Sequence, residues 1–159
     1  MKAVTVKVLK DELSHQSHKE LMDLCLQLSK FKKENKELLT YLLFESGDEE
    51  SYIESVKEQL DSQFETINTK SYFYIRKSLR KILTLTKKYI RYSKKKETEV
   101  DLLMFYCRKL KDFTPSIKNS VRLQNVFGRQ VILIKKAIAT LHEDLQYDYQ
   151  LELDDLLGL

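Results

Sequence analysis

Hydrophobic residues recur every three or four positions through most of the chain, which is the spacing of one face of an α-helix. One Pro and three Gly are too few for the many turns of a β-sandwich or barrel, which also favours helices. We therefore predict an all-α fold of about six or seven helices. They would pack as successive antiparallel pairs, in a helical-repeat-like or right-handed superhelical array.

The predicted helices cover about 5–13, 18–45, 49–67, 70–93, 99–112 and 115–147. Nothing between 18 and 45 decides between one bent helix and two. Gly128 either divides the last span or lies inside one long helix at a close packing contact. Residues 147–159 form either a short terminal helix or a tail.

Capping residues mark several helix starts. Ser17 and Glu20 form a capping box, and Asp48 is an N-cap that follows Gly47 as the C′ residue of the helix before it. Further starts are predicted at Thr98, as an N-cap, and at Thr114-Pro115, with the proline at the first helical position.

A chain of 159 residues can form one domain with a substantial core, so we expect a single helical domain over 1–159. No run approaches the ~18 apolar residues of a membrane span. No signal peptide is visible at the start of the sequence, which predicts a cytoplasmic protein. Cys25 and Cys107 lie in apolar helical patterns and are predicted to be buried free thiols.

Charge is segregated along the chain. The segment 70–96 holds eleven Lys or Arg and no acid, whereas 48–65 holds seven acids and one Lys, and 143–159 holds six acids and no base. We predict that the basic segment binds an anionic partner through ten residues. They are Arg76, Lys77, Arg80, Lys81, Lys87, Lys88, Arg91, Lys94, Lys95 and Lys96.

Two interpretations of this basic helix compete. In the first, it is a solvated face whose charges pair with the acidic helix 48–65 and the acidic C-terminal tail, leaving a positive surplus. In the second, it neutralises nucleic-acid phosphates while neighbouring tyrosines stack on bases. Those tyrosines are Tyr72, Tyr74, Tyr89 and Tyr92.

Catalytic and metal-binding patterns are sparse. His15, His18 and Asp11 would share a face only if one helix ran through all three, and the Ser17 capping box argues against that. His142-Glu143 starts like a zincin motif but lacks the second histidine. A catalytic pocket would have to join His142, a cysteine and acids from distant segments. We predict no metal, no cofactor and no enzymatic activity.

Two segments share a pattern at an offset of 82 residues. Leu, Met, Cys, Leu and Phe coincide between 21–31 and 103–113, which would indicate a duplicated helical unit. The C-terminal leucines Leu153, Leu156 and Leu157 either cover the protein's own core or dock in a partner's groove.

Segment 9–45 carries Lys19-Glu20-Leu21 and the run Lys33-Glu34-Asn35-Lys36-Glu37. Segment 99–114 carries Asp101-Leu102-Leu103-Met104 and ends in Phe113-Thr114. With these motifs, the two segments resemble a bacterial family of small all-helical proteins of unknown function. The resemblance implies an all-helical fold and no mechanism.

These observations favour a non-enzymatic protein-interaction or scaffold module that docks an acidic protein, or a second copy, on its basic helix. The alternative is a nucleic-acid-binding accessory protein that contacts phosphates through 70–96.

Overall fold

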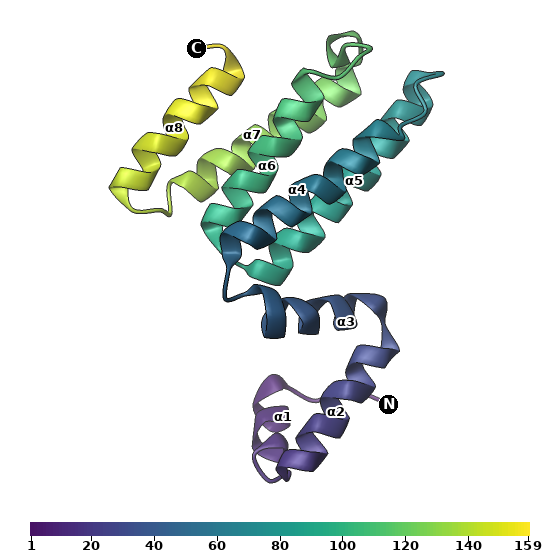
Figure 1. The fold of residues 1–159 in the computed structure, drawn as a ribbon, viewed down its shortest axis with the longest axis vertical. Coiled ribbons are helices and arrows are strands. Elements are labelled where there is room, and N and C mark those ends of the chain that lie inside the picture. The colour runs from purple at the N-terminus through teal and green to yellow at the C-terminus, as the bar shows by residue number, and fades with distance from the viewer. The chain divides into compact units, whose positions relative to one another are not determined.

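The computed structural model describes all residues, 1–159, and contains eight α-helices and no strand, so the predicted all-α class is confirmed. Figure 1 shows the helices in order. Their bounds are α1 Val6–Leu13, α2 His18–Phe31, α3 Lys33–Thr40, α4 Glu49–Glu65, α5 Tyr72–Ser93, α6 Lys96–Lys111, α7 Val121–Ile138 and α8 Glu143–Leu157. None of them combines the length and hydrophobicity that a membrane span requires.

Contacts between residues divide the chain into two compact units, Met1–Phe44 and Glu45–Leu159, where the length predicted one domain over 1–159. We call them the N-terminal unit and the C-terminal unit. The boundary lies inside the π-helical turn Tyr41–Glu45, directly before the predicted helix break at Gly47 and Asp48.

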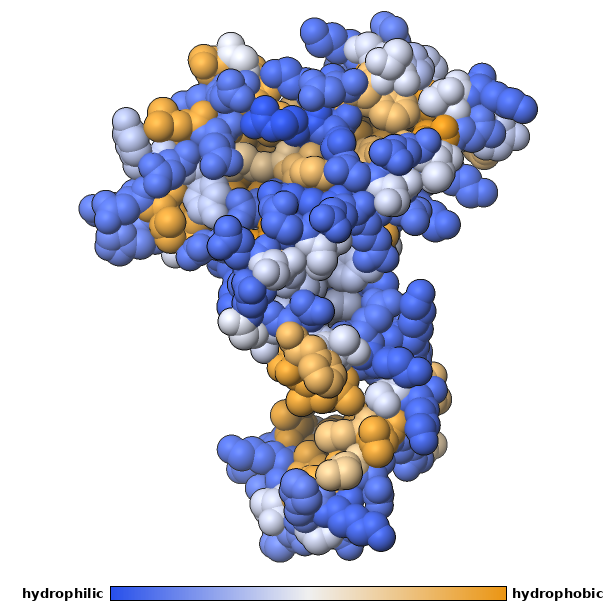
Figure 2. Space-filling view, viewed as in Figure 1, coloured by the Kyte–Doolittle hydropathy of each residue, from blue (hydrophilic) through white to orange (hydrophobic).

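The N-terminal unit contains α1, α2, α3 and most of the π-helical turn. The predicted capping box opens α2: the Glu20 amide donates to Ser17 Oγ at 3.2 Å, and the Ser17 amide donates to Glu20 Oε2 at 2.8 Å. Residues 18–45 form two helices, because Lys32 takes an extended conformation between them. Asn35 Nδ2 holds this break by donating to the Leu28 carbonyl at 2.8 Å. Figure 2 shows apolar side chains gathered around a hollow in this unit.

The predicted helix starts in the C-terminal unit were partly right. Asp48 caps α4 by accepting from the Ser51 amide at 3.2 Å. Gly47 does not take the left-handed conformation expected of a C′ glycine. The Thr98 prediction was wrong, since α6 already begins at Lys96 and Thr98 is buried in its first turn.

The prediction for Thr114-Pro115 was also wrong. A 3₁₀ turn, Ile117–Asn119, follows Pro115, and α7 begins only at Val121. Its cap is Ser120, whose Oγ accepts from the Leu123 amide at 3.4 Å. Gly128 lies inside α7, and a Cβ there would meet nothing within 4 Å, so no close packing contact requires this glycine.

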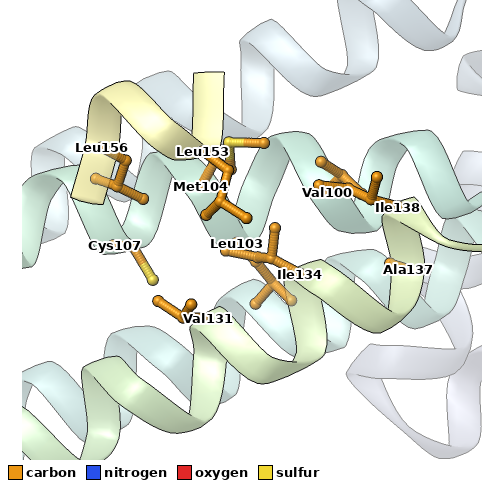
Figure 3. Close-up of a cluster of buried hydrophobic side chains, with 10 residues drawn as sticks. All are labelled: Val100, Leu103, Met104, Cys107, Val131, Ile134, Ala137, Ile138, Leu153 and Leu156. Atoms are coloured by element: carbon orange, nitrogen blue, oxygen red, sulfur yellow. The ribbon is translucent and has the colours of Figure 1, made fainter. Parts of the chain in front are cut away.

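Helix α6 is the centre of the C-terminal unit, because it packs against α4, α5, α7 and α8. Its apolar residues form one core with α7 and α8 (Figure 3). The ten buried members are Val100, Leu103, Met104, Cys107, Val131, Ile134, Ala137, Ile138, Leu153 and Leu156. The C-terminal segment is therefore a helix that covers the protein's own core, which confirms one of the two alternatives for Leu153 and Leu156.

The predicted helical-repeat arrangement is not confirmed. The two segments related by 82 residues lie in different surroundings: Cys25 in α2 is exposed, whereas Cys107 in α6 is buried. The prediction of a buried thiol was therefore wrong for Cys25 and right for Cys107.

Candidate functional site

The basic helix predicted at 70–93 is α5, Tyr72–Ser93, and it buries one apolar stripe. Ile75, Leu79 and Ile82 are in the core, followed by Thr86 and Tyr89. The helix ends at Lys94, which has a φ of 60° and a ψ of 5° and donates its amide to the Ile90 carbonyl at 2.9 Å. The basic residues occupy the sides of the helix outside the buried stripe.

Tyrosines and apolar side chains hold α4 against α5. The Tyr52 hydroxyl donates to the Tyr89 carbonyl at 2.8 Å, and the Tyr89 hydroxyl donates to Gln59 Oε1 at 2.8 Å. Two acids of α4 pair outside α5: Glu54 with Lys57 at 3.3 Å, and Asp61 with Lys109 of α6. The α4–α5 interface thus depends on more than the predicted pairing of acids with bases.

Glu49 ties the start of α4 to the α5–α6 junction. Its Oε1 accepts from Thr98 Oγ1 at 2.7 Å and from Ser93 Oγ, and its Oε2 lies 3.5 Å from Lys95 Nζ. Lys96 pairs with Glu99 at 2.7 Å. Lys95 and Lys96, both predicted to bind a partner, are therefore engaged in contacts within the protein.

A groove of about 520 Å³ runs between α5 and α7. Arg80 and Lys87 lie two turns apart on the same face of α5, and Arg129 lies on α7. The remaining lining residues are Leu83, Val126, Gln130, Ile132 and Leu133. The groove therefore has cations from both helices, a largely apolar floor and no acidic lining residue.

Gln130 is the one neutral polar residue of the groove. Its side chain is 3% exposed, and its Nε2 donates to the Val126 carbonyl at 3.1 Å within α7. Its Oε1 is buried and accepts no hydrogen bond.

The ten predicted partner-binding residues separate into groups in the structure. Arg80 and Lys87 line the groove, while Lys77, Lys81 and Arg91 are exposed outside its lining. Arg76 is half-buried, and Lys94 ends α5. The Lys88 ammonium lies 5.1 Å from the centre of the Tyr89 ring.

Arg129 was missed because the charge analysis followed the continuous basic run 70–96. The available signal is its place between Val126 and Leu133, where it interrupts an apolar helical face. Arg129 is itself exposed, and only the packing shows that it lines the same groove as Arg80 and Lys87.

The four tyrosines proposed to stack on bases do not line the groove. The Tyr72 hydroxyl donates to the Ser116 carbonyl at 2.9 Å. Tyr89 and Tyr92 are buried and meet edge to face, with ring centres 6.0 Å apart. Tyr74 is exposed and packs edge to face on Phe73.

A second hollow, about 780 Å³, lies at the start of α4 and is lined by both signs of charge. Its acids include Glu97 and Asp101, and its bases include Lys57 and Lys95. Burial raises the pKa of the Asp101 carboxyl, and the Tyr149 hydroxyl donates to its Oδ2 at 3.4 Å. Charges of both signs already face one another here, so this hollow offers no uniform attraction to an ion.

The histidines that the sequence singled out lie at helix ends. His15 Nδ1 lies 2.7 Å from the Asp11 carbonyl oxygen beyond the end of α1, and His18 is the first residue of α2. His142 Nδ1 accepts from the Asp144 amide at 3.3 Å and caps α8. No three His, Cys, Asp or Glu side chains come together in a group that could hold a metal ion.

The basic groove between α5 and α7 is thus the candidate site that the geometry defines best, and it combines two predicted residues with one that was missed. Comparison with known proteins adds no family to this description: no protein-family model, no curated protein and no solved structure matches the chain.

Proposed function

We propose that the protein is a non-enzymatic interaction module that binds an acidic amphipathic segment of a partner protein in the α5–α7 groove. The observation that carries this proposal is the combination of Arg80, Lys87 and Arg129 on the walls with Leu83, Val126 and Leu133 below them. An acidic helix with one apolar face would satisfy both parts of that surface.

The apolar floor favours a protein segment over a nucleic acid. A nucleic-acid backbone presents mainly charged phosphates and polar sugars, so it covers leucine and valine side chains less well than the apolar face of a helix does. Proteins that bind single strands without sequence preference add aromatic side chains on which bases stack. The groove has no aromatic lining residue, and Tyr72, Tyr89 and Tyr92 are held by the hydrogen bond or burial described above.

The charges of the groove would speed the association of the partner segment and orient it, and would add less to its affinity. Exposed ion pairs contribute about 0–1 kcal/mol each, and salt screens them. Burial of the apolar floor would supply affinity that salt does not weaken. The proposal therefore predicts binding with a moderate salt dependence and a component that survives high salt.

The test uses a synthetic helical peptide with leucines on one face and glutamates on the other, labelled for fluorescence anisotropy. In the full chain, the triple variant R80A/K87A/R129A removes the groove cations. The matched control K77A/K81A/R91A removes the same charge from exposed positions outside the groove. We expect at least about tenfold weaker binding for the groove variant and less than about twofold for the control.

Equal losses in the two variants would mean that the peptide follows net charge alone, which overturns the groove as the site. Single- and double-stranded DNA and RNA form a second arm of the same titration. Nucleic-acid binding with a steep salt slope, together with no peptide binding, would overturn the proposal in favour of the nucleic-acid alternative.

A further inference from the structure

The N-terminal unit exposes most of the protein's solvent-facing large apolar side chains. It holds 44 of the 159 residues but contributes 15 of the 22 large hydrophobic residues that are exposed. Tyr41 is its one buried hydrophobic residue, whereas 25 are buried in the C-terminal unit. A unit of this size rarely folds stably without further support, and oligomerisation is one of the usual sources.

Helices α2 and α3 of this unit enclose an apolar groove of about 230 Å³. It is lined chiefly by Cys25, Leu28, Leu38, Leu39 and Leu42. An apolar protein cavity of about 150 Å³ is large enough to bind benzene, so this groove has room for one phenyl ring.

The same unit presents two phenylalanines of that size to solvent. Phe31, at the end of α2, is 78% exposed, and Phe44, in the π-helical turn, is 79% exposed. Because both rings are largely exposed, neither of them fills the groove of its own unit. One chain therefore carries both an apolar recess and side chains that fit it.

We propose that the N-terminal unit is a homodimer interface in which Phe31 and Phe44 of one copy pack against the α2–α3 groove of a second copy. A two-fold axis lets each copy give its phenylalanines and receive the other's, so the arrangement closes at two chains. In this arrangement the groove of each copy is filled by a phenylalanine ring from the other copy.

The exposed apolar area of the unit, summed over all its faces, is comparable with what one partner buries in a standard interface. Fourteen exposed hydrophobic residues other than Met1, each between about one-third and four-fifths exposed, present on the order of 1,000 Å² if a whole side chain offers about 100–150 Å². A standard interface buries about 800 Å² on each partner.

The charge of the unit also suits a second copy. Residues 1–44 carry eight Lys and six Asp or Glu, so two copies repel one another weakly. A partner chosen by opposite charge would need a strongly charged surface here, and the unit has none. Apolar surfaces are complementary to themselves, which is the condition that a two-fold interface sets.

Sedimentation equilibrium and light scattering on the full chain test the proposal. The wild-type protein is expected to be a dimer in the micromolar range, and Phe31→Glu and Phe44→Glu are expected to weaken the dimer at least about tenfold. Both side chains are already exposed, so these changes leave the fold of the monomer intact. The matched control is Phe73→Glu, which adds the same charge at an exposed phenylalanine of the C-terminal unit.

Cys25 gives a second readout because it lines the groove. Burial raises the pKa of Cys107 to about 12 and hides its sulfur, so the reaction of the native protein with a thiol reagent reports Cys25. Cys25 should react slowly in the dimer and faster after dilution or in Phe44→Glu.

A monomeric wild-type chain overturns the proposal, whether Cys25 reacts quickly or is protected by the chain's own residues. Open-ended oligomers would overturn the two-fold pairing. The outcome is separate from the proposed function, because R80A/K87A/R129A should leave the dimer intact and Phe44→Glu should leave the α5–α7 groove intact.

Discussion

The Tyr106 hydroxyl donates to the Leu79 carbonyl at 2.7 Å, which joins α6 to α5 across 27 residues of sequence. Both residues are fully buried, and burial holds the pKa of Tyr106 above its usual range, so the hydroxyl stays a donor at any ordinary pH. This bond therefore links α6 to the basic helix inside the core.

Tyr106→Phe should lower the free energy of unfolding by about 1 kcal/mol, because the hydroxyl is lost while the Leu79 carbonyl keeps its place in the hydrogen bonding of α5. Urea denaturation followed by circular dichroism measures the change. The control is Tyr74→Phe, at an exposed tyrosine, which should stay within about 0.5 kcal/mol of the wild type. An equal effect of the two would contradict the assigned role of the buried bond.

Lys94→Gly should raise the free energy of unfolding by about 0.5–1 kcal/mol. Lys94 ends α5 in the left-handed region, where an L-residue is strained and glycine is not. The gain is reduced by the greater freedom of glycine in the unfolded chain. Lys77→Gly, inside α5, should have the opposite sign, at about 1 kcal/mol. Thermal and urea unfolding of both variants give the comparison.

Leu153→Ala should cost about 2–5 kcal/mol of stability, because it opens a cavity between α8 and the core that α6 and α7 form. Leu151→Ala, two residues earlier on the same helix, removes the same atoms from an exposed position and should cost less than about 0.5 kcal/mol. Similar losses in the two variants would show that α8 does not pack as described.

Asp101→Asn should stabilise the protein at neutral pH, and the gain should disappear in acid. Burial is the main cause of the raised pKa of Asp101; Glu97 and Glu152 raise it further, and Lys57 and the Tyr149 hydroxyl oppose the rise. A raised folded-state pKa means that ionisation costs stability above that pKa. The cost ends once the carboxyl is protonated in both states, below about pH 4.

Urea unfolding of the wild type and the Asn variant across this pH range tests the sign. Two curves that run parallel from pH 7 to pH 3 would show that protonation of Asp101 has no part in the difference.

Local signals predicted much of the fold. The Ser17 box and the Asp48 cap each depend on residues three positions apart, and both were right. The break at Lys32 was undecided, because it depends on an Asn35 amide that reaches back seven residues to Leu28. The prediction that Thr98 caps a helix was wrong, because the Thr98 hydroxyl donates to Glu49, 49 residues away in the sequence.

In the candidate site, too, local spacing was predictable and contacts between distant segments were not. Arg80 and Lys87 were predicted from one helix, since a spacing of seven residues places them two turns apart on the same face. Arg129 could not be added, because its position opposite them follows from packing through α6 and not from any sequence spacing. The acidic helix was expected to pair its charges with the basic one, and the α4–α5 interface also contains the Tyr52–Tyr89 and Tyr89–Gln59 hydrogen bonds.

The central position of α6 has a consequence for how residues 45–159 come apart. In a linear helical repeat each unit touches only its neighbours, so the ends can fray while the middle stays folded. Here α4 and α5 on one side, and α7 and α8 on the other, share α6 as a common partner. Neither pair can leave without exposing the apolar surface of the helix on which the other depends, so this part of the chain should melt in a single transition.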